Sequence, residues 1–219
     1  MSHYFTLNTI SEVMCLSFAI VYLLNDTSLI WRSMILYMLI TCIVEFLGIY
    51  VERSGHFNYW VYNVFLIFEA GFTMLMFAGL FKGYHQSKFV IIGVVTFIIL
   101  YVCELIRHGF FIYYNNFTYT VMSVLYVLYG LYYYYLMIRD DNPIDIKYSP
   151  VFWWVAGTVF FYFGNTACNL FSIQFGSVKI YQQLSYIIFK VLNVILYGCW
   201  SYSFICKKWA TTKFKASLS

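Results

Sequence analysis

One lysine, Lys190, lies inside the apolar run IIFKVLNVILYG (187–198), which belongs to a segment long enough to cross a bilayer. An ionisable side chain within hydrocarbon is costly and usually faces the interior of a helix bundle. The polar residues around Lys190 recur at spacings of three and four, which places them on one helical face: Gln183, Tyr186, Asn193 and Tyr197. This face is therefore predicted to meet other helices, and Lys190 is a candidate site residue.

Four glutamates in other apolar segments are the acidic groups available to this lysine: Glu12, Glu45, Glu69 and Glu104. In a low dielectric, four carboxylates beside one ammonium cannot all be ionised cheaply. We therefore expect one or two of them to be protonated, and we expect Lys190 to stay charged by pairing with Glu69 or Glu45. Glu12 and Glu104 lie near the ends of their segments, where solvated or capping residues are common.

The candidate ligand-binding set joins these charges to amide and phenol groups on the same helical faces. Its members are Lys190, Glu69, Glu45, Asn193, Asn165, Asn169, Tyr62, Tyr162 and Tyr186. No catalytic residue is predicted. Two other interpretations of Lys190 stay open, because its ammonium can reach the headgroups along its apolar stem or can form a purely structural pair. Asn165 and Asn169 also fit interhelical hydrogen bonds that hold helices together.

The elements that must position these residues are helices in a membrane. The chain is 63% hydrophobic and 10% charged, against about 25% charged residues in soluble domains. Seven apolar segments are long enough to span: 6–24, 29–51, 58–81, 88–106, 113–138, 151–174 and 181–206. The predicted fold is an all-α, polytopic bundle of seven transmembrane helices, with one domain over residues 1–206 and a short basic cytoplasmic tail over 207–219.

The lysines and arginines between the segments predict that the N-terminus lies outside and the C-terminus in the cytoplasm. In this orientation the cytoplasmic side receives Arg32, Lys82, Lys88, Arg139, Lys147, Lys207, Lys208, Lys213 and Lys215, and the outer side receives Arg53, Arg107 and Lys179. The polar groups of all seven segments then share the outer half of the bilayer. The inner halves, such as 74–81 and 125–138, are predicted to form an aromatic, apolar plug.

Motifs for metals and cofactors are weak in this sequence. The pairs Glu52/His56 and Glu104/His108 have one-turn spacing but lie in different segments near the outer surface, so no metal site is predicted. A lysine in the seventh helix and a carboxylate in the third is the arrangement that holds retinal in microbial rhodopsins. Tyr186, and not an acidic residue, stands one turn before Lys190, so no cofactor is predicted.

Three stretches carry a resemblance: EFLG (45–48), NYWVYNVFLIFE (58–69) and SPVFWWVAG (149–157). With them the chain resembles an uncharacterised family of small seven-span bacterial membrane proteins with no established activity. The resemblance implies a seven-helix fold and a multi-pass location in the bacterial inner membrane, and it assigns no functional residue.

The function predicted from these features is a non-enzymatic module that senses or binds a small ligand in an outward-facing polar pocket. Its predicted partners are the lipid bilayer and a separate signalling protein on the cytoplasmic side. No nucleic acid is expected, because the positive-inside bias of the loops accounts for the net charge of +4. A transporter of small solutes, ions or protons is the first alternative. An intramembrane enzyme acting on lipid is the second.

Overall fold

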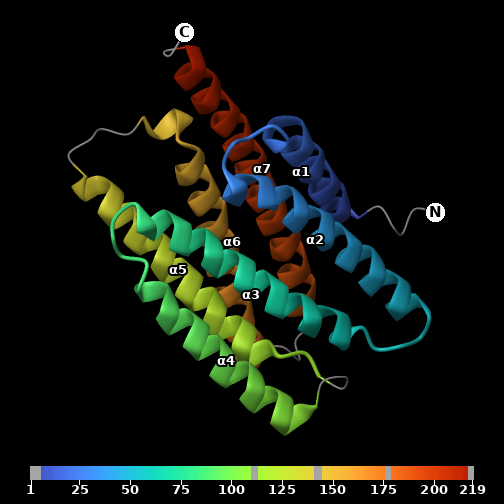
Figure 1. Ribbon diagram of the computed structural model, residues 1–219. Coiled ribbons are helices and arrows are strands. Elements are labelled where there is room, and N and C mark those ends of the chain that lie inside the picture. The colour runs from blue at the N-terminus through green and yellow to red at the C-terminus, as the bar shows by residue number, and fades with distance from the viewer. Residues whose placement is uncertain (1–5, 110–112, 141–144, 176–178, 217–219) are drawn as a thin grey trace.

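The structure of the chain, a computed structural model, describes the backbone of residues 6–109, 113–140, 145–175 and 179–216, and the side chains of these residues except 172–182 and 212–216. Within these ranges the chain forms seven α-helices and one short 3-10 helix (Figure 1). The elements are α1 (Leu7–Leu23), α2 (Leu29–Arg53), α3 (Tyr59–Lys82), α4 (Phe89–His108), α5 (Asn116–Arg139), η1 (Ile146–Tyr148), α6 (Pro150–Phe175) and α7 (Lys179–Ala216). All seven predicted segments are therefore helical.

Several helix ends have a local chemical cause. The Thr6 hydroxyl accepts a hydrogen bond from the Thr9 amide at 3.2 Å, which satisfies one of the free N–H groups at the start of α1. The Asp26 carboxylate accepts from the Ser28 amide at 2.7 Å in the turn between α1 and α2. Gly109 follows α4 with φ 75°, a backbone conformation that glycine adopts without steric cost.

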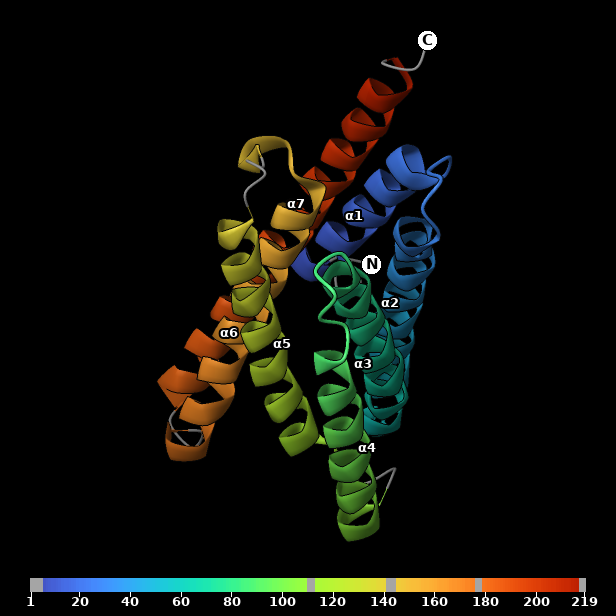
Figure 2. The same cartoon turned by 60° about the vertical axis from the view of Figure 1, so that its left-hand side comes forward.

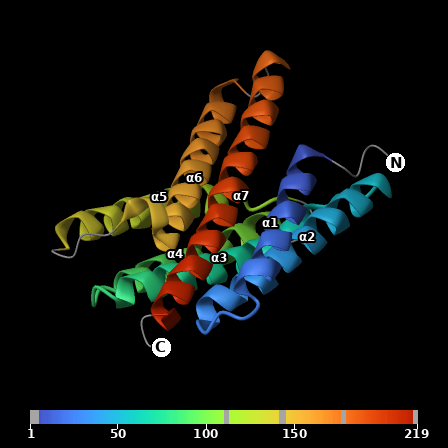
Figure 3. The same ribbon diagram turned by 90° about the horizontal axis from the view of Figure 1, so that it is seen from above.

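The helices form a closed ring. Each helix contacts the next one in the chain, and α7 also contacts α1, while α3 reaches across to α5. In Figure 2, α5 and α6 stand opposite α2 and α3, and Figure 3 shows α7 lying between α6 and α1. Side chains from several helices therefore project into the interior of the ring.

The chain is a multi-pass membrane protein. Among the described residues, five helices are long and apolar enough to cross a membrane, namely α2, α3, α4, α5 and the part of α7 from Gln183 to Thr211, and α1 is apolar but shorter. The count of seven spans and the N-out orientation stay predictions. The side chains of Lys179, Lys213 and Lys215, on which part of that orientation depends, lie outside the described side chains.

One end of the ring is filled by large aromatic side chains. We call it the basic end; it carries the connections 24–28 and 83–88, the last residues of α5 and the last turns of α7. Trp154, Phe77, Phe81 and Phe204 are completely or almost completely buried there, and the ring centroids of Phe77 and Trp154 are 5.4 Å apart. The aromatic plug predicted for 74–81 and 125–138 is therefore present in the packing.

The helix α7 continues ten residues beyond its predicted end at 206 and projects past its neighbours (Figure 1). Contacts with the α1–α2 connection hold it there. The Lys207 ammonium lies 3.9 Å from the Asp26 carboxylate, and the Thr211 hydroxyl donates to the same carboxylate at 3.3 Å. Most of the predicted tail 207–219 is thus part of a helix, and 217–219 lie outside the described residues.

Candidate functional site

A cavity of about 200 Å³ lies inside the ring and holds three carboxylates, one each from α1, α2 and α3: Glu12, Glu45 and Glu69. We call it the glutamate cavity. Its other lining residues are Asn8, Tyr37, Thr41, Val44, Tyr62, Phe65, Tyr114, Tyr119, Phe161, Tyr162, Asn193, Leu196, Tyr197 and Trp200. None of these lining residues is a lysine, an arginine or a histidine. The cavity is therefore acidic, with no basic side chain to balance it.

A tyrosine from another helix faces each of the three carboxylates. The Tyr162 hydroxyl on α6 donates to Glu69 at 2.6 Å, and the Tyr197 hydroxyl on α7 donates to Glu12 at 3.2 Å. The Tyr62 hydroxyl on α3 lies within interaction range of the Glu45 carboxylate. The two hydrogen-bonded pairs tie α3 to α6 and α1 to α7, so they fix Glu69 and Glu12 at the cavity wall.

The cavity contains hydrogen-bond acceptors that no protein group satisfies. Glu12 is only 6% exposed, and its Oε2 has no hydrogen-bond partner among the described residues. The Oδ1 of Asn8, one turn earlier on α1, is buried and likewise has none. Buried polar atoms normally find partners in the protein, in ordered water or in a ligand, so these two acceptors are open to a hydrogen-bond donor from outside the chain. A ligand that completes them must donate hydrogen bonds.

Aromatic rings form much of the remaining wall. The Tyr37 ring stacks on Phe72 with centroids 4.4 Å apart and meets Trp200 edge-on at 5.8 Å. Trp200 donates its indole N–H to the Trp154 carbonyl at 3.2 Å, which links the cavity wall to the aromatic plug below. Aromatic faces attract cations through their quadrupole, so this wall and the carboxylates favour the same sign of ligand charge.

Lys190 lies outside the glutamate cavity, in an adjoining pocket of about 460 Å³ that we call the lysine pocket. Its lining residues are Thr6, Asn8, Glu45, Ile49, Glu52, Arg53, Tyr186 and Lys190. Asn8 and Glu45 line both volumes, which makes them the shared wall between the two. The Lys190 ammonium lies over the Tyr186 ring, 4.1 Å from its centroid.

The predicted ion pair between Lys190 and Glu69 or Glu45 is wrong. No carboxylate oxygen of the described residues lies within 4.0 Å of the Lys190 ammonium. The reason is that α7 directs this side chain toward Tyr186, one turn earlier, while Glu69 points into the cavity and is satisfied by Tyr162. The prediction that the lysine face of α7 meets other helices holds for Asn193 and Tyr197, which line the cavity, whereas Gln183 and Tyr186 are exposed.

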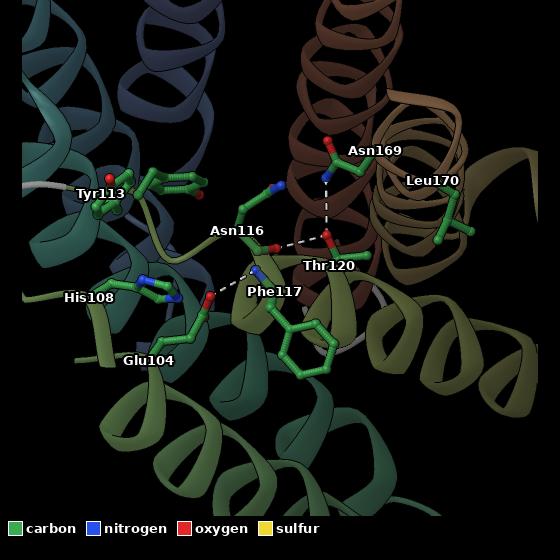
Figure 4. A pocket seen from close by; sticks show the side chains of 9 residues that line it. Glu104, His108, Tyr113, Asn116, Phe117, Thr120, Asn169 and Leu170 are labelled. Atoms are coloured by element: carbon green, nitrogen blue, oxygen red, sulfur yellow. Dashed lines mark hydrogen bonds between the residues drawn. The ribbon is translucent and has the colours of Figure 1, made fainter. Parts of the chain in front are cut away.

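A third pocket, of about 400 Å³, lies between α4, α5 and α6 (Figure 4). Asn169 donates there to the Thr120 hydroxyl at 3.3 Å, which fits the interpretation of this asparagine as a link between helices. Glu104 accepts from the amides of Phe117 at 3.1 Å and Thr118 at 2.7 Å, so it caps the start of α5. Of the two roles expected for Glu104, solvated or capping, the structure shows the capping one, at the start of a different helix.

The structure brings together part of the predicted ligand-binding set. Glu45, Glu69, Tyr62, Tyr162 and Asn193 line the glutamate cavity, and Lys190 and Tyr186 line the lysine pocket. Asn165 and Asn169 line neither volume, although Asn165 is completely buried and its side-chain atoms have no partner in the part of the chain that is described.

Glu12 is the residue that sequence reasoning misjudged. It was expected to be solvated or capping, and it is buried in the cavity because α7 covers α1 along this face. Asn8 and Tyr197 also line the cavity, although the predicted ligand-binding set does not contain them. The signal that marks α1 was nevertheless present, since Asn8 and Glu12 are spaced by one helical turn in an otherwise apolar helix.

The three glutamates do not converge on a single point. No group of three or more His, Cys, Asp or Glu side chains in the described ranges is arranged to hold a metal ion. The carboxylates instead surround a volume, which suits a polyatomic ligand better than a single ion.

Comparison of the chain with family models, curated proteins and solved structures gave no match.

Proposed function

We propose that this protein binds a small organic cation, a protonated amine, in the glutamate cavity. The observation that carries the proposal is the unpartnered Oε2 of the buried Glu12, which faces a cavity with two further carboxylates and no basic side chain. An ammonium group supplies the hydrogen-bond donors and the positive charge that these acceptors require.

The shape of the site supports an organic ammonium over an inorganic cation. The carboxylates are spread over α1, α2 and α3, and aromatic rings fill the space between them. A carbon chain or ring of the ligand can pack on those rings while its ammonium reaches the carboxylates. A bare inorganic ion has no carbon atoms that could pack on the aromatic part of the wall.

The module operates in the bacterial inner membrane with its N-terminus outside. The excess of lysine and arginine at the basic end supports this orientation, and the family resemblance of the sequence supports the compartment. The lysine pocket then opens on the outer side, next to the connection between α2 and α3, and the ligand arrives from outside the cytoplasm.

Occupancy of the cavity is passed along α7 to a separate signalling protein at the basic end. The helix α7 carries Asn193 and Tyr197 in the cavity wall and continues without interruption to Lys207 and Thr211, which hold the α1–α2 connection. A rigid helix that contacts the ligand site and the far surface is suited to transmit a small shift. The Lys207 ammonium also lies 5.7 Å from the Trp31 ring, which joins α2 to the same contact.

A transporter is supported less well than a binding module. Transport requires a route from the cavity to the basic end, and that part of the ring is filled by Trp154, Phe77 and Phe81. A lipid-modifying enzyme would need a nucleophile or metal ligands, and the described lining of the cavity offers carboxylates and phenols. The aromatic plug closes the ring below the acidic cavity, and this packing favours a receptor over a transporter.

Calorimetric titration of the purified protein in lipid nanodiscs tests the proposal. We use two ammonium ions, ethanolammonium and benzylammonium, each with its neutral counterpart, ethylene glycol or benzyl alcohol. Either ammonium is expected to bind at one site per chain at least about 30-fold more tightly than its counterpart, since a hydrogen bond between charged groups contributes about 2 kcal/mol. The proposal fails if neither ammonium binds, or if the neutral compounds bind equally well.

A further inference from the structure

The lysine pocket contains a cation that the binding of a simple amine does not use. The Lys190 ammonium is held over the Tyr186 ring at 4.1 Å, with no carboxylate oxygen of the described residues within 4.0 Å. The other charged residues of this pocket are Arg53, Glu45 and Glu52. Of these, Glu45 also lines the glutamate cavity, together with Tyr62. Lys190 is therefore available to an anionic group.

The two volumes adjoin along one face of α7. Asn8 and Glu45 line both of them, and Asn193, one turn after Lys190, lines the glutamate cavity. Lys190 and Tyr197 lie seven residues apart on this face, which separates them by about 10 Å along the helix axis. Tyr197 in turn donates to Glu12. A single extended ligand can thus meet an ammonium at one end and a buried carboxylate at the other.

We infer that the ligand is a zwitterion, with its ammonium group in the glutamate cavity and its anionic group on Lys190 in the lysine pocket. This inference rests on the proposed function and specifies the class of ligand. The order of the charges follows from the lining, because the glutamate cavity has carboxylates and no basic side chain, whereas the adjoining pocket has Lys190 and Arg53 beside Glu45 and Glu52.

Two sources supply such a ligand. One is a free amino acid or phosphoamine in solution, and the other is the headgroup of a zwitterionic lipid in the same membrane leaflet. Both present an ammonium and an anionic oxygen group joined by a short chain, so both carry the two charges that the linings of the two volumes favour. A change in the lipid composition of the nanodisc separates the two sources.

The test compares three probes in nanodiscs made of phosphatidylglycerol, a lipid without an amine. Ethanolammonium carries the positive charge alone, while O-phosphoethanolamine and 3-aminopropanoate carry an anionic group as well. At least one zwitterion is expected to bind about 10-fold more tightly than ethanolammonium, because it adds a charge-assisted hydrogen bond to Lys190.

Lys190→Met provides the decisive readout. In this variant the zwitterion is expected to lose about 10-fold in affinity, whereas ethanolammonium is expected to bind somewhat more tightly because a nearby positive charge is gone. The matched control Lys88→Met removes an exposed lysine that lines neither volume and should leave both affinities as in the wild type. Lys190→Gln, which keeps a polar group, repeats the measurement if the methionine variant does not fold.

The inference is overturned if neither zwitterion binds more tightly than ethanolammonium, or if the advantage survives Lys190→Met. If no amine of any kind binds to the wild type, the proposed function itself fails, and the inference falls with it. Replacing part of the phosphatidylglycerol by phosphatidylethanolamine then identifies the source. A drop in apparent affinity for the free zwitterion indicates that the lipid headgroup occupies the site, and an unchanged affinity indicates a free solute.

Discussion

Replacing Glu12 by glutamine is expected to weaken the binding of an ammonium ligand by about 30-fold, which corresponds to about 2 kcal/mol for one charge-assisted hydrogen bond. The substitution keeps the size of the side chain. It leaves an oxygen to accept from Tyr197, which now donates to Oε1 at 3.2 Å. The change is therefore directed at Oε2, the atom without a protein partner. Calorimetric titration of the variant with ethanolammonium measures the effect.

Glu104→Gln is the matched control for this variant. Glu104 is also a glutamate in an apolar helix, but its carboxylate caps the start of α5 and lies outside the glutamate cavity. This control is expected to lose about 1 kcal/mol of stability through the weaker cap and to keep its affinity for the ammonium within about twofold. Equal losses of affinity in the two variants would show that carboxylates act at long range and not by contact.

Replacing Trp154 by alanine is expected to lower the free energy of unfolding by about 3–5 kcal/mol. The Trp154 side chain is 1% exposed, stacks on Trp200 at 6.0 Å and meets Phe77 edge-on at 5.4 Å. Its indole N–H has no partner in the described structure, so the loss comes from packing and not from a hydrogen bond. Unfolding in mixed micelles of dodecyl maltoside and sodium dodecyl sulfate measures it.

The neighbouring Trp153 offers a control of the same residue type. Its ring meets Tyr202 at 5.0 Å, its indole N–H donates to the Lys147 carbonyl at 3.2 Å, and it is only partly buried. Trp153→Ala is expected to cost about 1 kcal/mol, because partly exposed side chains lose less packing and the hydrogen bond is near the surface. A cost as large as that of Trp154→Ala would contradict the assignment of Trp154, and not Trp153, to the aromatic plug.

Apolar length and helical spacing were sufficient to predict the helices. All seven segments are helical, with ends within three residues of the prediction except at the C-terminus of α7. That exception has a physical reason. A run of apolar residues marks where a helix leaves hydrocarbon, whereas the helix itself continues as long as contacts hold it, and here Lys207 and Thr211 contact Asp26.

Helical spacing predicts the direction of a side chain but not its partner. On the face of α7 that carries Lys190, Asn193 lines the cavity as the spacing predicts, whereas Tyr186 is 58% exposed. The partner of Lys190 depends on the depth and tilt of the other helices, which the pattern of one helix does not contain. In the structure Tyr186 meets the ammonium, and the glutamates meet tyrosines.

Glu12 is a second residue whose neighbours the local spacing does not predict. Its place near the start of a segment suggested a solvated residue, since segment ends usually lie at the membrane surface. The ring closes by packing α7 on α1, and this contact between the two ends of the chain buries Glu12 against Tyr197. A contact between residues 185 positions apart cannot be read from local periodicity.

The most direct test of an ammonium site is a crystal structure of the protein with 4-bromobenzylammonium, in which anomalous scattering locates the bromine. We expect one bromine peak inside the glutamate cavity, with the ammonium within about 3 Å of the Glu12 Oε2. The neutral 4-bromobenzyl alcohol, at the same concentration, should give no peak there. Bromine in the pocket between α4, α5 and α6 alone, or equal occupancy by the ammonium and the alcohol, would contradict an ammonium site in the glutamate cavity.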